Sequence, residues 1–150
     1  MKKILVTTTA LAIMCFFACK KKDTTAMAGP SMMVNTSSPA HVSDTIGKGT
    51  FTSYDHGLEG NTILYKDSSG NKTLRLYNFN MTAGPDVHLY LSTTSSYSSS
   101  NIIELSHFTT GYNNSSINFP VNSASYGSNY KYVLVYCIQY SSLFGYAELK

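Results

Sequence analysis

The strongest constraint on the fold lies in the stretch from Tyr130 to Leu149, YKYVLVYCIQYSSLFGYAEL. Its first half is rich in β-branched and aromatic residues, which suit a packed, pleated surface. At the two-residue period of a strand, one face carries Val133, Val135 and Cys137, and the other carries Tyr132, Leu134, Tyr136 and Ile138. Because both faces are apolar, we expect a central strand covered on both sides, with the Cys137 thiol in the middle of the fold. Residues 143–149 are expected to form a short closing strand.

The other apolar segments are short and are separated by Gly, Pro, Asn, Asp and Ser, with no helical period between them. We expect strands at 47–54, 62–65, 73–79, 87–91, 102–105 and 117–121, with a turn at 111–114. In the strand at 87–91, Asp86, His88 and Tyr90 share the face opposite Val87, Leu89 and Leu91. Residues 92–100 are almost entirely Ser, Thr and Tyr and are expected to form a surface loop. The pattern predicts one all-β domain at 41–150, a mostly antiparallel β-sandwich or barrel.

The N-terminal segment has the pattern of a targeting signal. Two lysines precede an apolar run at 4–18, which is too short to span a membrane and suits a signal peptide. The run ends in Phe16-Phe17-Ala18-Cys19, which resembles a bacterial lipoprotein signal, and Lys20 to Asp23 resembles the start of Bacteroidetes envelope lipoproteins. We therefore expect a signal peptide at 1–18, lipidation of Cys19 and a flexible linker at 19–40. An ordinary secretory signal cleaved elsewhere is the alternative.

The charge distribution argues against nucleic acid as a partner. The formal net charge is +3, but five of the lysines lie within the first 22 residues. From His41 onward, six basic residues face seven acidic ones, so the domain has no electrostatic footprint for a phosphate backbone. No nucleophile elbow, phosphate loop or nucleotide fingerprint is present, which leaves hydrolase and transferase functions without support.

Several segments together resemble the DM-thirteen domain, a family named for electron transfer. The segments, in the family's order, are Gly49–Phe51, His56–Gly60, Leu74–Phe79, Gly84–Ser92, Tyr132–Cys137 and Phe144–Leu149. The resemblance implies that Cys137 corresponds to the family's near-invariant cysteine. That cysteine is suggested to act in redox chemistry, either as a free thiol or as a ligand to a group such as haem.

Two interpretations of Cys137 remain open at this stage. With Cys19 acylated, Cys137 has no partner within the mature chain, and an odd cysteine in an oxidising compartment is buried, reactive or paired with another molecule. Free cysteine often packs in a core as a small hydrophobic residue. A reactive thiolate needs nearby positive charge and some exposure, and only Lys131 is close in sequence.

Histidines could complete a cofactor site around this thiol. We consider a set in which His56, His88 and Cys137 converge, because nitrogen and sulfur ligands suit copper or zinc, or one axial position of haem. No sequence spacing demands this set, and taken singly each histidine suits a surface or hydrogen-bonded role. Asp86 is expected to accept backbone N–H bonds in its turn, and His41 and His107 are given no role.

Two functions follow from these patterns. The first is a redox or electron-transfer module, lipid-anchored in the cell envelope and facing the periplasm or the cell surface, that works with a redox partner protein. It requires a solvent-reachable Cys137 with a histidine within about 5 Å. The second is a non-catalytic envelope module whose loops at 92–100 and 123–129 bind glycans or proteins, with Cys137 enclosed in the core. Either is more plausible than a stand-alone enzyme.

Overall fold

The structure, a computed structural model, describes residues 44–54 and 56–150. These residues form eight β-strands: β1 Asp44–Ser53, β2 Glu59–Lys66, β3 Lys72–Met81, β4 Val87–Ser92, β5 Ile102–Phe108, β6 Tyr112–Val121, β7 Tyr132–Cys137 and β8 Ser142–Glu148. The predicted all-β fold is confirmed. The predicted signal peptide, linker and lipidated Cys19 lie outside the described residues. No helix long and apolar enough to cross a membrane occurs in the described ranges.

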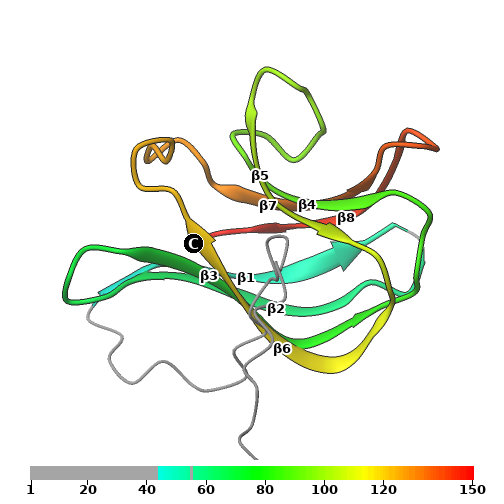
Figure 1. Cartoon of the computed structure of the whole chain (residues 1–150), viewed down its shortest axis with the longest axis horizontal. Helices are drawn as coiled ribbons and strands as arrows, with labels where there is room; N and C mark the ends of the chain where they lie inside the picture. Colours follow the sequence, from blue (N-terminus) through cyan, green and yellow to red (C-terminus); the bar gives the residue numbers. More distant parts are fainter. Residues whose placement is uncertain (1–43, 55) are drawn as a thin grey trace, which may run out of the picture. The chain divides into compact units, whose positions relative to one another are not determined.

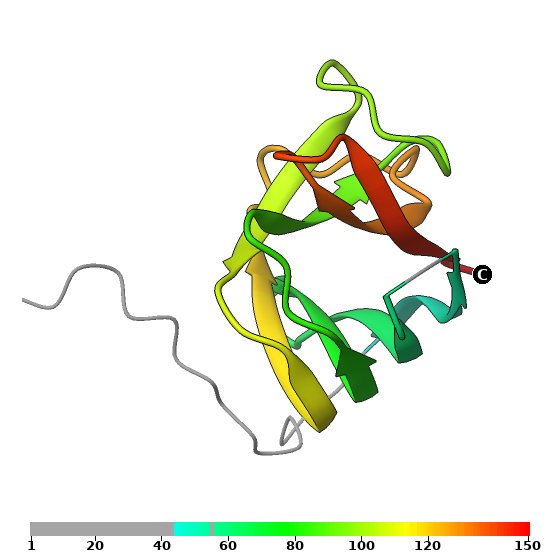
Figure 2. The same ribbon diagram turned by 90° about the vertical axis from the view of Figure 1, so that its right-hand side faces the viewer.

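The strands form one antiparallel sheet in the order β5-β4-β7-β8-β1-β2-β3-β6. Strand β1 belongs to both halves, because Asp44 to Thr50 pair with β2 while Phe51 to Ser53 pair with β8. The two edge strands, β5 and β6, also contact each other, so the sheet is a nearly closed barrel. Figure 2 shows its two layers, with β7 and β8 on one side and β2, β3 and β6 on the other. An antiparallel sheet with almost no free edge satisfies nearly all of its backbone hydrogen bonds internally.

Close packing between the first and last strands requires glycine. Gly145 in β8 lies opposite Ser53 of β1, and a Cβ at this position would press against the carbonyl oxygen of Thr52 and the side chain of Leu58. Any larger residue would push β8 away from β1. This glycine therefore allows the two halves of the sheet to meet.

The core is filled by alternate residues of the strands, as the strand period predicts. Leu74, Leu76 and Phe79 from β3 and Val87, Leu89 and Leu91 from β4 are fully buried, and so are Val133, Val135 and Cys137 from β7. Phenylalanine rings join the layers: Phe79 lies 6.0 Å from Phe108, and Phe108 lies 6.0 Å from Phe119. The expected placement of the Cys137 side chain in the middle of the fold is confirmed.

The outer face of β7 is covered by a loop that the sequence analysis expected to stay on the surface. Leu134 is fully buried on this face, and the Tyr97 ring, from the loop after β4, stacks on Tyr136 with centroids 4.0 Å apart and planes 5° apart. The expected surface loop at 92–100 is confirmed for residues 93–100, while Ser92 is buried at the end of β4 and Tyr97 supplies apolar area that holds the loop against the sheet.

Strand β6 also begins earlier than the sequence suggested. The expected turn at 111–114 is wrong, because β6 starts at Tyr112 and includes both asparagines that resembled a turn signal. Asn114 has a positive φ of 43°, and its backbone N–H donates to Asn80 Oδ1 at 2.8 Å. The asparagines thus form an irregularity within the strand, where the register with β3 shifts.

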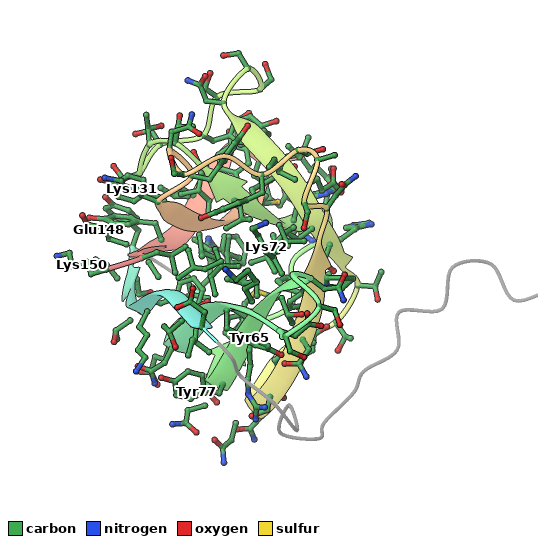
Figure 3. The ribbon with its side chains drawn as sticks, turned by 90° about the vertical axis from the view of Figure 1, so that its left-hand side faces the viewer. Tyr65, Lys72, Tyr77, Lys131, Glu148 and Lys150 are labelled. Atoms are coloured by element: carbon green, nitrogen blue, oxygen red, sulfur yellow. The ribbon has the colours of Figure 1, made fainter. Side chains whose placement is uncertain are left out.

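One end of the barrel carries five of the domain's six cations. There β1, β3 and β7 begin and β2 and β8 end, as their pairing shows. Figure 3 labels Lys72, Lys131 and Lys150 on this side. We call it the lysine end; its residues are Lys48, Lys66, Lys72, Lys131 and Lys150. The described chain starts at this end, with Asp44.

Candidate functional site

Strands β4 and β5 bring two histidines together on the outer face of the sheet. In the register of this pair, His88 of β4 lies directly opposite His107 of β5, while β7 lies on the other side of β4 (Figure 1). The two imidazole rings stack with centroids 4.4 Å apart and planes 10° apart. Both side chains point away from the core, because the residues paired on its inner face are Val87 and Phe108.

Two carboxylates flank this histidine pair. Asp86 immediately precedes β4, and its carbonyl oxygen accepts the N–H of Ile138 at 2.9 Å, which ties this position to the end of β7. Asp86 Oδ1 lies 2.8 Å from His88 Nε2 and 3.4 Å from His107 Nε2. On the other side, Glu104 Oε1 lies 2.8 Å from His88 Nδ1. We call Asp86, His88, Glu104 and His107 the outer-face cluster.

The cluster favours a protonated His88. Both of its ring nitrogens lie within hydrogen-bonding distance of a carboxylate, and only the imidazolium form donates from both. Partial burial lowers the pKa of His88, but hydrogen bonds and charge from Asp86 and Glu104 outweigh it, so the pKa is raised above its usual value. This imidazolium therefore offsets part of the negative charge of the two carboxylates.

Tyrosines form a wall on one side of the cluster. The buried Tyr90 ring lies 5.8 Å from His88, nearly parallel to it, and Tyr97 lies 5.4 Å from Tyr90. Burial, followed by the charge of Glu104, strongly raises the pKa of Tyr90, so the phenol stays neutral. The wall leaves the His88 side chain 15% exposed, whereas that of His107 is 44% exposed. The cluster is therefore packed on one side and open on the other.

Three members of the cluster could hold a metal ion. Asp86, His88 and His107 each offer a ligand atom, and these atoms all lie within 4.8 Å of one another. Within the described ranges, no other group of three histidine, cysteine, aspartate or glutamate side chains meets that condition. The cluster is thus the place on the described domain where a cation is best accommodated.

The structure does not bring His56, His88 and Cys137 together. Cys137 is fully buried and pairs with Val87 on the core face of the sheet, opposite the face that carries His88. His56 lies in the turn between β1 and β2, where its ring stacks on Phe144 at 4.0 Å and its carbonyl oxygen accepts two hydrogen bonds from Thr82. Of the three residues, only His88 lies in the cluster.

The sequence pattern did not indicate a role for His107 and predicted a different contact for Asp86. The Asp86 carboxylate was expected to accept backbone N–H bonds, but it contacts the two imidazoles. Only the pairing register reveals His107, since the connection between β4 and β5 is long and the register shifts between Leu89 and Tyr90. The available signal was weaker, because the strand expected at 102–105 ends two residues before His107, whereas β5 continues to Phe108.

A comparison with protein families gives one match. The family model described as Electron transfer DM13 matches residues 50–149, a range that contains the whole cluster and Cys137. No curated protein and no solved structure matches the chain. The matched range covers most of the chain and almost all of the described domain, from within β1 to the end of β8. The chain therefore belongs to the Electron transfer DM13 family.

Proposed function

We propose that this protein is a lipid-anchored component of a bacterial cell envelope whose DM13 domain transfers electrons with a redox partner protein. The observation that carries the proposal is the family match over residues 50–149. The N-terminal run that resembles a lipoprotein signal and ends at Cys19 supports a lipid anchor, and the segment at 19–40 supports a tether after it. In this proposal the anchor keeps the domain near membrane-bound partners and so raises their effective concentration.

The geometry favours the outer-face cluster over the thiol as the working site. Cys137 is fully buried, whereas a redox-active thiol needs access and a positive neighbour. The cluster is open on one side and combines imidazoles with carboxylates, which are common ligands for redox metals. A redox-active group held there by Asp86, His88 and His107 would supply one-electron chemistry between a reduced and an oxidised partner protein.

In this proposal the cluster faces a partner protein, and its place in the barrel supports this orientation. The described chain begins at the lysine end, while Asp86 and His88 lie where β4 begins, paired with the end of β7. Since β7 begins at the lysine end, the cluster lies toward the opposite end of the barrel. A tether that joins at the lysine end therefore leaves the cluster accessible to a partner protein.

The second candidate function is a non-catalytic envelope module that binds glycans or proteins. The enclosed Cys137 favours it, because this reading expects the thiol to pack in the core. Tyr54 and Tyr140, with 60% and 68% of their surfaces exposed, offer aromatic contacts for such a ligand. In this case the family's redox name does not describe the activity of this chain.

Redox titration of the mature protein, extracted from envelope membranes in detergent, separates the two functions. Absorption spectra, metal analysis and voltammetry are recorded on the wild type and on Cys137→Ala. A reversible one-electron couple retained in Cys137→Ala supports the proposal. If the redox couple is absent from a folded Cys137→Ala variant, the Cys137 thiol is the redox group. If no couple appears, either as isolated or after addition of copper, iron or haem, the binding module replaces the proposal.

Localisation is tested separately with Cys19. Wild type and Cys19→Ser are expressed in a bacterial host, and envelope and soluble fractions are probed with an antibody against the domain. We expect the wild type in the membrane fraction and Cys19→Ser released from it, because one residue carries the lipid. A membrane-bound Cys19→Ser would contradict the anchor.

A further inference from the structure

We propose that Asp86, His88 and His107 form a binding site for one divalent transition-metal ion. The donor set is two imidazole nitrogens and one carboxylate oxygen, a combination that proteins use for zinc, copper and non-haem iron. The family match does not assign these residues a role. The inference names the class of group that the proposed electron transfer would use, and metal binding itself does not depend on that function.

The distances within the site suit a shared ion. Two ligand atoms bonded to one metal at about 2.1 Å are about 3.0 Å apart at a right angle and about 3.4 Å apart at a tetrahedral angle. Asp86 Oδ1 lies 2.8 Å from His88 Nε2 and 3.4 Å from His107 Nε2. The carboxylate oxygen is therefore already at coordination spacing from both imidazoles. Binding replaces the proton between Asp86 and His88 with the ion.

Glu104 supplies the support that metal-binding histidines usually have. Its Oε1 lies 2.8 Å from His88 Nδ1, so it accepts the proton on that nitrogen and leaves Nε2 free to face Asp86 and the ion. A carboxylate behind a histidine ligand fixes the tautomer and raises the ligand's basicity. The Tyr90 ring, stacked beside His88, restricts the imidazole further. The site is thus held in shape before the ion arrives.

The open side of the site leaves room for further ligands. The His107 side chain is 44% exposed and Asp86 is 34% exposed, so water or a partner's side chain can complete the coordination shell. Without thiolate or thioether ligands, the site suits divalent ions, and affinities should follow the usual order in which Cu²⁺ binds most tightly. Copper or iron would carry an electron here, whereas zinc would bind without redox activity.

Metal titration of the mature protein, stripped with a chelator, tests the inference. Zn²⁺ and Cu²⁺ are added separately and followed by calorimetry, and the Cu²⁺ sample by electron paramagnetic resonance. We expect one ion per chain and coupling to two imidazole nitrogens. Glu104→Gln should weaken binding by about 10- to 100-fold, as the loss of a supporting carboxylate does elsewhere. His107→Ala, which removes a ligand, should weaken it more.

His56→Ala is the matched control, because His56 lies apart from the cluster in the turn before β2. Its affinity should equal that of the wild type, and circular dichroism should show that each variant folds. Equal affinities of His107→Ala and His56→Ala would overturn the site, and so would wild-type protein that binds neither ion. A site that binds Zn²⁺ while neither the copper nor the iron form shows a reversible couple would leave this inference standing and contradict electron transfer at the site.

Discussion

His88 and His107 lie directly opposite each other on neighbouring antiparallel strands, with their rings stacked 4.4 Å apart at an angle of 10°. This relationship depends on the pairing of β4 with β5, in which the register shifts once, between Leu89 and Tyr90. A slip of one residue would turn one ring toward the core. The cluster is therefore a product of the sheet, and changes that loosen this part of the sheet should also disturb the cluster.

Tyr97 should hold the loop between β4 and β5 against the sheet. Tyr97→Ala removes its stack on Tyr136 and its contact with Tyr90, and should lower the free energy of unfolding by about 1–2 kcal/mol. Urea unfolding measures this change, and limited proteolysis should cut the loop faster. Tyr140→Ala, at a position that is 68% exposed, is the control and should change neither. Equal effects of the two substitutions would show that the stack does not fix the loop.

Cys137 should be unreactive toward thiol reagents until the domain unfolds, because its side chain is fully buried. The measurement compares the rate of labelling of the mature chain carrying Cys19→Ser in buffer and in guanidinium chloride. Labelling should be slow in buffer and complete once the chain is denatured. Rapid labelling of the native protein would mean that the thiol is reached without unfolding, and would revive it as a redox residue.

Gly145→Ala should destabilise the domain by about 1–3 kcal/mol, because its Cβ would press on Thr52 and Leu58 where β8 meets β1. Thermal or urea unfolding measures the loss. Gly127→Ala is the matched control, since its nearest neighbour is the flexible end of the Asn129 side chain, and it should cost little. A tolerated Gly145→Ala would show that the two halves of the sheet can separate at this point without loss.

Asp67 should stabilise the folded domain only while its carboxyl group is ionised, so its contribution should disappear in acid. The Asn71 side chain, followed by backbone N–H groups of the same turn, holds the pKa of Asp67 below its usual value of 3.8. Since the folded-state pKa is depressed, the contribution is complete above the unfolded-state value and disappears as the pH falls through the folded-state value. Asp67→Ala should therefore be less stable than wild type near pH 6 and approach it near pH 2. A difference that does not vary with pH would contradict this.

Much of the fold could be predicted because it depends on local patterns. Apolar residues alternate at 87–91 and form a continuous run at 133–137, and turn residues mark most strand ends. The start of β6 could not be predicted this way, because Asn113 and Asn114 have the composition of a turn yet lie in the strand. The packing of Tyr97 was missed for a similar reason, since a single ring outweighs the serines around it.

The cluster could be predicted only in part. His88 was considered as a metal ligand, and the sequence shows directly that Asp86 shares its strand face, although Asp86 was expected to bond to its turn. His107 and Glu104 were not assigned to the site, because their positions depend on which strands pair and in what register. The suggested grouping of His88 with Cys137 also depended on strand pairing. His88 pairs with Tyr136 on the outer face, and Cys137, the next residue along β7, points to the core.

We propose that the redox group of this domain is held by the outer-face cluster and not by the thiol. A redox titration of the copper-loaded mature protein, followed by electron paramagnetic resonance, compares wild type, His107→Ala and Cys137→Ala. We expect a Cu²⁺ signal that is reversibly reduced in wild type and Cys137→Ala and is lost in His107→Ala. A couple that survives His107→Ala but disappears in a folded Cys137→Ala would contradict it.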